Sequence, residues 1–341
     1  SDGNHAVDDF SSLGLTAKAK ISQTELRIGT LQPKLPVIVS NDGRMLPQTF
    51  QGGQITSSEF KDLTFTGGQI EHAKGRNSSN NEGLSIAGAN NSVTGKFVNK
   101  FYYGGVDYKL NKDLLLQYYY GNLEDFYKQN FLGLVHNWSI GPGVLKSDLR
   151  YFNSTDDGKN GHNSAYYTTG DYANSSAGSG KGKVDNNLIS GLFLYTVEGH
   201  TFGGGYQVSN GSSDFPFLNQ GDGASAYIPT DMQISKFARA GERTWQARYS
   251  YDFAKVGVPG LTAGAVYLRG DNIDTYNSKN VQTSNGASEW ERDITVAYVI
   301  QEGTLKNLGF MWKNAMWRND IASQRDQDEN RLIVSYSIPL L

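Results

Sequence analysis

The stretch RLIVSYSIPL, residues 331–340, alternates between two kinds of side chain along its whole length. Every second residue from Leu332 to Leu340 is apolar or aromatic, whereas Arg331, Ser335 and Ser337 lie on the other side of the alternation. A repeat of two residues indicates a β-strand with one apolar and one polar face. We therefore predict a strand near residues 329–340.

The same alternation recurs along most of the chain, whereas helical periodicity over three turns is hard to find. In residues 144–151, for example, leucine and tyrosine alternate with charged side chains. The pattern predicts about fifteen strands. They lie near residues 12–22, 24–32, 52–59, 63–73, 99–110, 113–124, 129–140, 143–154, 186–198, 200–209, 243–254, 261–271, 289–301, 306–318 and 329–340.

The composition favours a membrane barrel over a soluble domain. Only 38% of the 341 residues are hydrophobic and the mean hydropathy is −0.50, yet 12% are aromatic. A barrel strand gives alternate residues to lipid and to a wet lumen, which accounts for this combination. No apolar run approaches the ~18 residues that a membrane helix needs. The predicted fold class is therefore all-β, a transmembrane antiparallel β-barrel with residues 1–341 as a single domain.

The predicted connections alternate between short and long, as the periplasmic turns and external loops of an outer-membrane barrel do. One exception, near residues 124–129, is short. Because a bacterial single-chain barrel has an even number of strands, we expect an odd number of strands to precede Ser1. The long connections are residues 33–51, 75–98, 155–185, 210–242, 271–288 and 319–328.

Several function classes lack support in the sequence. The net charge of −3 argues against a nucleic-acid partner. The five histidines show no pairing at metal-ligand spacing, so no metal site is predicted. Residues 179–182, Ser-Gly-Lys-Gly, depart from a phosphate-binding loop at two positions. No Gly-x-Ser-x-Gly turn occurs either, and we expect neither an enzyme nor a cofactor.

Several segments resemble the OprD-type porins, and they occur in the order of that family. Residues 31–37, LQPKLPV, and 41–49, NDGRMLPQT, are similar to the third loop of these proteins. The BenF-like branch of benzoate channels looks closest. The other similar segments are residues 122–127, 245–249, 258–261, 269–274 and 329–334.

The resemblance implies a monomeric outer-membrane barrel of about eighteen strands. Its third loop, here residues 33–51, would fold into the lumen and narrow it, and a ladder of basic side chains would guide carboxylate-bearing solutes. Tyr127 falls on a tyrosine near the constriction. Where other members carry basic residues, this chain has Met311 and Ala297. The family's basic positions match Lys18, Lys20, Arg44, Lys313 and Arg331.

Strand parity predicts the same ladder independently. If the apolar face of each strand contacts lipid, seven cations point inward. An outward cation would cost about 2–4 kcal/mol at the bilayer midplane. The seven are Lys18, Lys20, Arg27, Arg150, Arg248, Lys313 and Arg331.

Each cation has a second interpretation, in which it only holds a salt bridge with an inward Asp148, Glu291 or Asp293. Arg248 and Arg331 could equally brace the wall.

The predicted function is passive diffusion of small carboxylates, with aromatic acids such as benzoate among the candidates, through a positively lined pore in the outer membrane. Charged rings in a narrow channel select ions by sign. The expected partners are small anionic solutes and outer-membrane lipid. The alternatives are a barrel enzyme that hydrolyses lipids and a structural or adhesive barrel whose loops bind partners.

Overall fold

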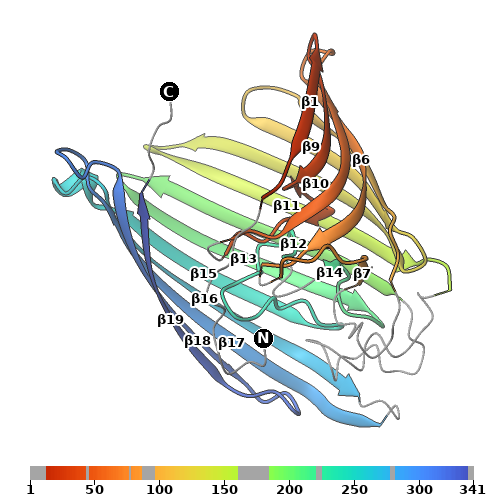
Figure 1. The fold of residues 1–341 in the computed structure, drawn as a ribbon. Coiled ribbons are helices and arrows are strands. Elements are labelled where there is room, and N and C mark those ends of the chain that lie inside the picture. Colours follow the sequence, from red (N-terminus) through yellow and green to blue (C-terminus); the bar gives the residue numbers. More distant parts are fainter. Residues whose placement is uncertain are drawn as a thin grey trace.

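The computed structural model describes residues 13–43, 46–76, 78–86, 97–159, 184–219, 225–276 and 281–336. Fifteen strands form one curved antiparallel sheet in which neighbours in space are neighbours in sequence (Figure 1). Within these ranges no pairing joins the first strand to the last, so both are sheet edges. The strands are β1 (Thr16–Ile21), β2 (Thr24–Leu31), β5 (Thr49–Ser57), β6 (Leu63–Lys74), β8 (Phe101–Lys109), β9 (Leu114–Leu123), β10 (Tyr127–Ile140), β11 (Gly143–Asp156), β12 (Asp185–Val197), β13 (His200–Gly211), β15 (Arg243–Asp252), β16 (Leu261–Tyr276), β17 (Gln282–Val299), β18 (Leu308–Asn319) and β19 (Gln327–Tyr336).

All fifteen predicted strands are confirmed, with ends that move by up to seven residues. Residue 12 of the first predicted strand and residues 337–340 of the last lie outside the described residues. The long loop predicted at residues 271–288 is wrong in part, because β16 continues to Tyr276 and β17 already begins at Gln282. Register shifts interrupt the pairing between Gly270 and Tyr276, and the polar composition there hides the strand pattern. A small buried cluster of Ile273, Ala287 and Ile321 stabilises this extension.

On this sheet the apolar side chains are exposed and the polar ones are buried, which is the reverse of the arrangement in a water-soluble protein. On β11, Leu149 is 40% exposed whereas its neighbour Asp148 is only 8% exposed. On the adjacent β12, Ile189 is 54% exposed and Ser190 is buried. Apolar side chains outside and polar side chains inside are what a barrel wall requires in lipid. Across the described residues, no helix is long and apolar enough to cross a membrane.

Short turns join the strands at one end of the sheet. At the β12–β13 turn, Glu198 and Gly199 both have positive φ, 50° and 83°. Two successive positive φ values define the tight turn that matches the twist of paired strands. This turn therefore fixes the register in which Val197 pairs with His200.

Two additional pairs of short strands lie on the concave side of the sheet, and sequence periodicity did not predict them. They are β3 (Lys34–Leu35) with β4 (Ile38–Val39), and β7 (Ser85–Ile86) with β14 (Leu218–Asn219). Figure 1 shows β7 and β14 within the curve of the sheet. Two residues per strand are too few to show an alternation, so only long-range pairing reveals them.

The hydrophobic core lies where these inner elements meet the wall. Val37 and Ile38 belong to the same buried cluster as Phe131 and Phe152, whose rings lie 4.7 Å apart on β10 and β11. Gly121 on β9 lets the inner loop approach closely, since a Cβ there would meet the Cβ of Val37 at 3.0 Å. The core is thus between loop and wall, not between two layers of sheet.

Candidate functional site

The strand pairing places all seven cations predicted by parity on the inner face of the sheet, because directly paired residues share a face. Lys18 is the cross-strand partner of Arg27, and Lys313 is the partner of Arg331. Arg150 follows the buried Asp148 at an interval of two residues on β11, so both side chains project to the same side. Arg44 lies outside the described residues.

Three of these arginines form ion pairs with an acid two residues earlier on the same strand. Arg150 binds Asp148 through Nε and Nη2, each at 2.8 Å, and both side chains are mostly buried. Arg331 binds Glu329 at 2.6 and 2.9 Å, and Arg27 binds Glu25. For Arg150 the pair with Asp148 is the salt bridge that we weighed from the sequence. The other two acids were missed, although residues two apart on a strand share a face.

Arg150 and Arg248 also hold a polypeptide segment against the wall. This inner segment comprises residues 225–239, within the connection from β13 to β15. Arg150 Nη1 donates to the carbonyl oxygen of Tyr227 at 3.1 Å, and its guanidinium lies 4.1 Å from the centre of the Tyr227 ring. Arg248 Nη2 donates to the carbonyl oxygen of Pro229. The two guanidiniums therefore brace a loop, in addition to any effect on solutes.

The three lysines are the cations that stay available. In the described part of the chain, Lys18, Lys20 and Lys313 have no acid within ion-pair distance. Lys18 and Lys20 are exposed on the edge strand β1. Lys313 is half-buried on β18 and interacts electrostatically with Asp293 at longer range. A lysine ammonium is a compact, hydrated charge that suits transient binding of anions.

Within the described ranges, neither Glu291 nor Asp293 of β17 forms a salt bridge with a cation of the ladder, although Asp293 interacts with Lys313 at longer range. Glu291 accepts hydrogen bonds from the backbone amides of Ile234 and Ser235, at 2.8 and 2.7 Å. Asp293 accepts one from the amide of Gln233 at 3.4 Å. These carboxylates therefore bind the inner segment. Sequence patterns could not predict this, because a polar loop carries no periodic signal of what it contacts.

The inner segment carries its own buried charges. Burial raises the pKa of Asp231, and the Lys236 ammonium, 3.4 Å from that carboxylate, opposes the shift. At the end of the same connection, burial and the neighbouring Glu289 carboxylate raise the pKa of Glu242 well above its ordinary value. Lys236 therefore serves the segment itself and is not a free cation of the lumen.

Tyr127 is fully buried in the hydrophobic core, at the start of β10. Its hydroxyl has no hydrogen-bond partner in the part of the chain that the structure describes. The structure thus places this tyrosine beneath the inner loops, where it packs and does not contact the lumen.

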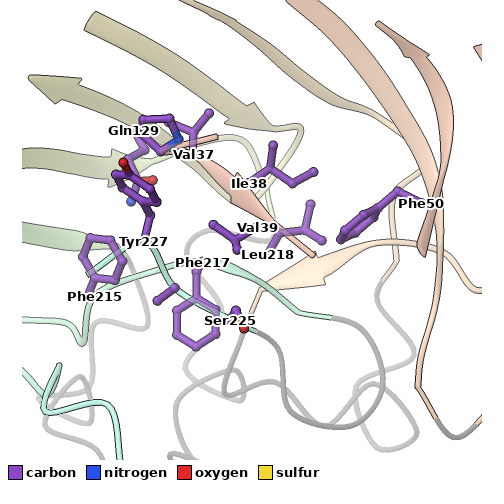
Figure 2. A pocket seen from close by; sticks show the side chains of 12 residues that line it. Val37, Ile38, Val39, Phe50, Gln129, Phe215, Phe217, Leu218, Ser225 and Tyr227 are labelled. Carbon is purple, nitrogen blue, oxygen red and sulfur yellow. The ribbon is translucent and has the colours of Figure 1, made fainter. Parts of the chain in front are cut away.

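The described part of the loop predicted at residues 33–51 meets the inner segment and its approach at residues 215–218, although the loop ends earlier than predicted, because β5 begins at Thr49. Figure 2 shows Val37, Ile38 and Phe50 on one side of a narrow cavity, and Phe217 and Tyr227 on the other. Gln129 from β10 closes the cavity and donates to the carbonyl oxygen of Pro216 at 3.0 Å. Two loops far apart in sequence therefore pack as one unit on the inner face.

Among the described ranges, no three histidine or acidic side chains gather in a geometry that could hold a metal ion. The chemistry of the inner face is that of fixed charges.

Comparison with known proteins connects this architecture to porins. The model of the family "outer membrane porin, OprD family" matches residues 1–340. The porin-like protein GalP of Pseudomonas putida is 34% identical over 341 residues, which is 100% of this chain and 74% of GalP. The crystal structure of Pseudomonas aeruginosa OccK8 (OprE) superimposes with a TM-score of 0.90 at 61% identity, covering 100% of this chain and 83% of that one. Pseudomonas aeruginosa OpdK, solved with vanillate, gives a TM-score of 0.85 at 32% identity, covering 98% and 80%.

Proposed function

The chain belongs to the OprD family of outer membrane porins, and we propose that it carries small carboxylate-bearing solutes, aromatic acids among them, through a lumen lined by lysines. Its family makes it a channel for small solutes in the outer membrane, not an enzyme. The closeness to the BenF-like branch remains a prediction.

One observation carries the proposal: Lys313 lies on the inner face opposite Arg331 and has no ion-pair partner among the described residues. A cation inside a channel with low-dielectric walls focuses the field and concentrates anions. With Lys18 and Lys20, it provides separate weak sites in place of one strong trap, which passive conduction requires.

A relative supports the proposed chemical class of the solute. OpdK was crystallised with vanillate, an aromatic carboxylate of the benzoate type. The carboxylate is the group that lysine would recognise, and the ring needs apolar surroundings. We extend the class, though not the individual compound, to this chain.

This proposal assigns fewer cations to the pathway than strand parity alone did. Arg27 and Arg331 share their charge with Glu25 and Glu329, and Arg150 and Arg248 bind the inner segment. We assign the pathway chiefly to Lys18, Lys20 and Lys313, with Arg331 as a weaker member. Arg44 stays in the proposal on the strength of its resemblance to a family position.

The test is electrical recording from the full-length protein in planar bilayers. Wild type should show anion preference in a salt gradient, and added benzoate should reduce the chloride current by competition. The Lys313→Ala and Arg44→Ala variants should both weaken that preference, whereas Lys306→Ala, in an exposed turn, should not. Unchanged preference in both variants would reject the pathway, and a wild type without conductance would favour a structural or adhesive barrel.

A further inference from the structure

We propose that Glu291 is a positioning residue of the channel: its carboxylate clamps the inner segment to the wall and so controls how wide the pathway is. This inference rests on the proposed channel function. It concerns a residue that would act through the polypeptide and would not touch the solute.

Both oxygens of Glu291 are committed to the segment. Oε1 accepts from the amide of Ile234 at 2.8 Å, and Oε2 accepts from the amide of Ser235 at 2.7 Å. Glu291 itself has no exposed surface. A buried carboxyl group needs such partners, because an oxygen left without a hydrogen bond away from water is expensive.

The neighbours of Glu291 on the same face extend the clamp in both directions. Glu289 accepts from the Ser235 hydroxyl at 2.7 Å, and Asp293 accepts from the Gln233 amide at 3.4 Å. On β19, Glu329 accepts from the Gln233 side chain at 3.2 Å. Four acids therefore accept hydrogen bonds from residues 233–235, and among them Glu291 binds two backbone amides.

The far end of the segment is bound with the opposite polarity. Arg150 and Arg248 bind the carbonyl oxygens of Tyr227 and Pro229. The segment therefore presents amides to acids at one end and carbonyls to guanidiniums at the other. A shift by one residue would bring mismatched groups together, so the segment has one favoured seat on the wall.

The position of the clamp connects it to conduction. Asp293, two residues from Glu291, faces the inner surface near Lys313. When the segment is seated, its amides satisfy the acids of β17, and Lys313 dominates the local field. If the segment leaves its seat, the lumen widens and these carboxylates are exposed beside Lys313. Loosening the clamp should therefore raise conductance and lower anion preference together.

The first test compares Glu291→Gln with Glu25→Gln in full-length channels. Glu25 is also an inward acid, but it pairs with Arg27 on β2. A glutamine at position 291 keeps the size but leaves only one oxygen to accept, so the hydrogen bond from one of the two backbone amides is lost. We expect the time spent in a high-conductance state to rise about tenfold. Glu25→Gln should leave that time unchanged, and Glu291→Asp, which keeps two acceptor oxygens, should restore most of the wild-type behaviour.

A chemical test keeps the proposal falsifiable if Glu291→Gln does not fold. The 341 residues contain no cysteine, so Ser235→Cys introduces a single reporter in this stretch. Its thiol should react with a charged methanethiosulfonate at least about tenfold more slowly than that of Ser323→Cys in an exposed loop. Adding Glu291→Gln should remove most of the difference.

Equal thiol reactivity at positions 235 and 323, or equal gating in Glu291→Gln and Glu25→Gln, would overturn the clamp. Either result, with a wild type that still prefers anions, would leave the proposed function standing. A wild type that conducts without anion preference would instead reject the function.

Discussion

Lys313 and Arg331 face each other across the β18–β19 pair, yet among the described side chains only Arg331 is bound by an acid, Glu329. Two cations in direct cross-strand register would repel each other in a medium of low dielectric. Glu329 relieves that repulsion by screening one of them, and it leaves Lys313 as the freer charge. We therefore expect Arg331 mainly to stabilise the wall and Lys313 to attract anions.

This division predicts that Glu329→Gln makes the channel more selective for anions. The substitution removes one negative charge from the inner face and frees the Arg331 guanidinium, while the glutamine still offers an oxygen to the Gln233 side chain of the inner segment. We expect the anion-over-cation permeability ratio to rise by about twofold or more. Reversal potentials in a salt gradient measure that ratio. Glu302→Gln, in an exposed turn, is the control, and a ratio that stays constant or falls would contradict the assignment.

Lys313→Glu is the converse change and should have the larger effect. It reverses a charge that faces Arg331 and lies near Asp293. We expect the permeability ratio to fall about fivefold or more, with benzoate competition lost. Lys306→Glu in the β17–β18 turn makes the same charge change away from the inner face. If both variants behave alike, net charge and not position is responsible.

Sequence reasoning succeeded where physics imposes a period. Lipid on one side and water on the other force the alternation that identified the strands and the inner face, from Lys18 to Arg331. The ion pair Asp148–Arg150 was weighed for the same reason, because residues i and i+2 share a face, whereas Glu329 was overlooked although it precedes Arg331 by the same interval. The seat of residues 233–235 on Glu291 was not, because it joins positions 56 to 57 residues apart without a repeating pattern.

The close approach of Val37 to Gly121 predicts that a methyl group at this glycine destabilises the barrel. A Cβ at position 121 would lie 3.0 Å from both the Val37 Cβ and the Phe101 ring. Overpacking of this kind costs about 1–3 kcal/mol. Urea-induced unfolding of Gly121→Ala in detergent measures the loss. Gly204→Ala is the matched control, since a Cβ there meets nothing within 4 Å, and equal midpoints would refute the packing.

The brace between two neighbouring turns should weaken on acidification. Glu59 accepts hydrogen bonds from Ser22 Oγ at 2.9 Å, Gln23 N at 2.7 Å and Thr24 Oγ1 at 3.0 Å. The Ser22 and Gln23 bonds favour the charged form and lower the pKa of Glu59 below its ordinary value of 4.5. For a lowered carboxylate pKa, the stabilising contribution is complete above the unfolded value and disappears as pH falls through the folded one.

We therefore expect the Gln23 amide to exchange with solvent slowly at pH 7 and, after correction for intrinsic rates, progressively faster as the pH falls below 4.5, the ordinary carboxylate value. Glu59→Gln should show the faster exchange already at pH 7. Exchange that is equally slow in the variant would show that the β1–β2 turn does not depend on this carboxylate.

Arg150 should resist conservative replacement because it binds three groups at once. It grips Asp148 through two nitrogens, donates to the Tyr227 carbonyl and stacks on the Tyr227 ring. A lysine has no planar fork and cannot reproduce this arrangement. Removing the cation altogether leaves the 8% exposed Asp148 without a partner, which costs about 3–5 kcal/mol for a buried pair.

Arg150→Met should therefore lower the urea midpoint strongly, and Arg150→Lys should lower it in part. The double variant Asp148→Asn with Arg150→Met should recover most of the stability, although it still loses the bond to Tyr227. If the double variant is as unstable as Arg150→Met alone, the unpaired aspartate is not the cause, and the loss must come from the unanchored inner segment.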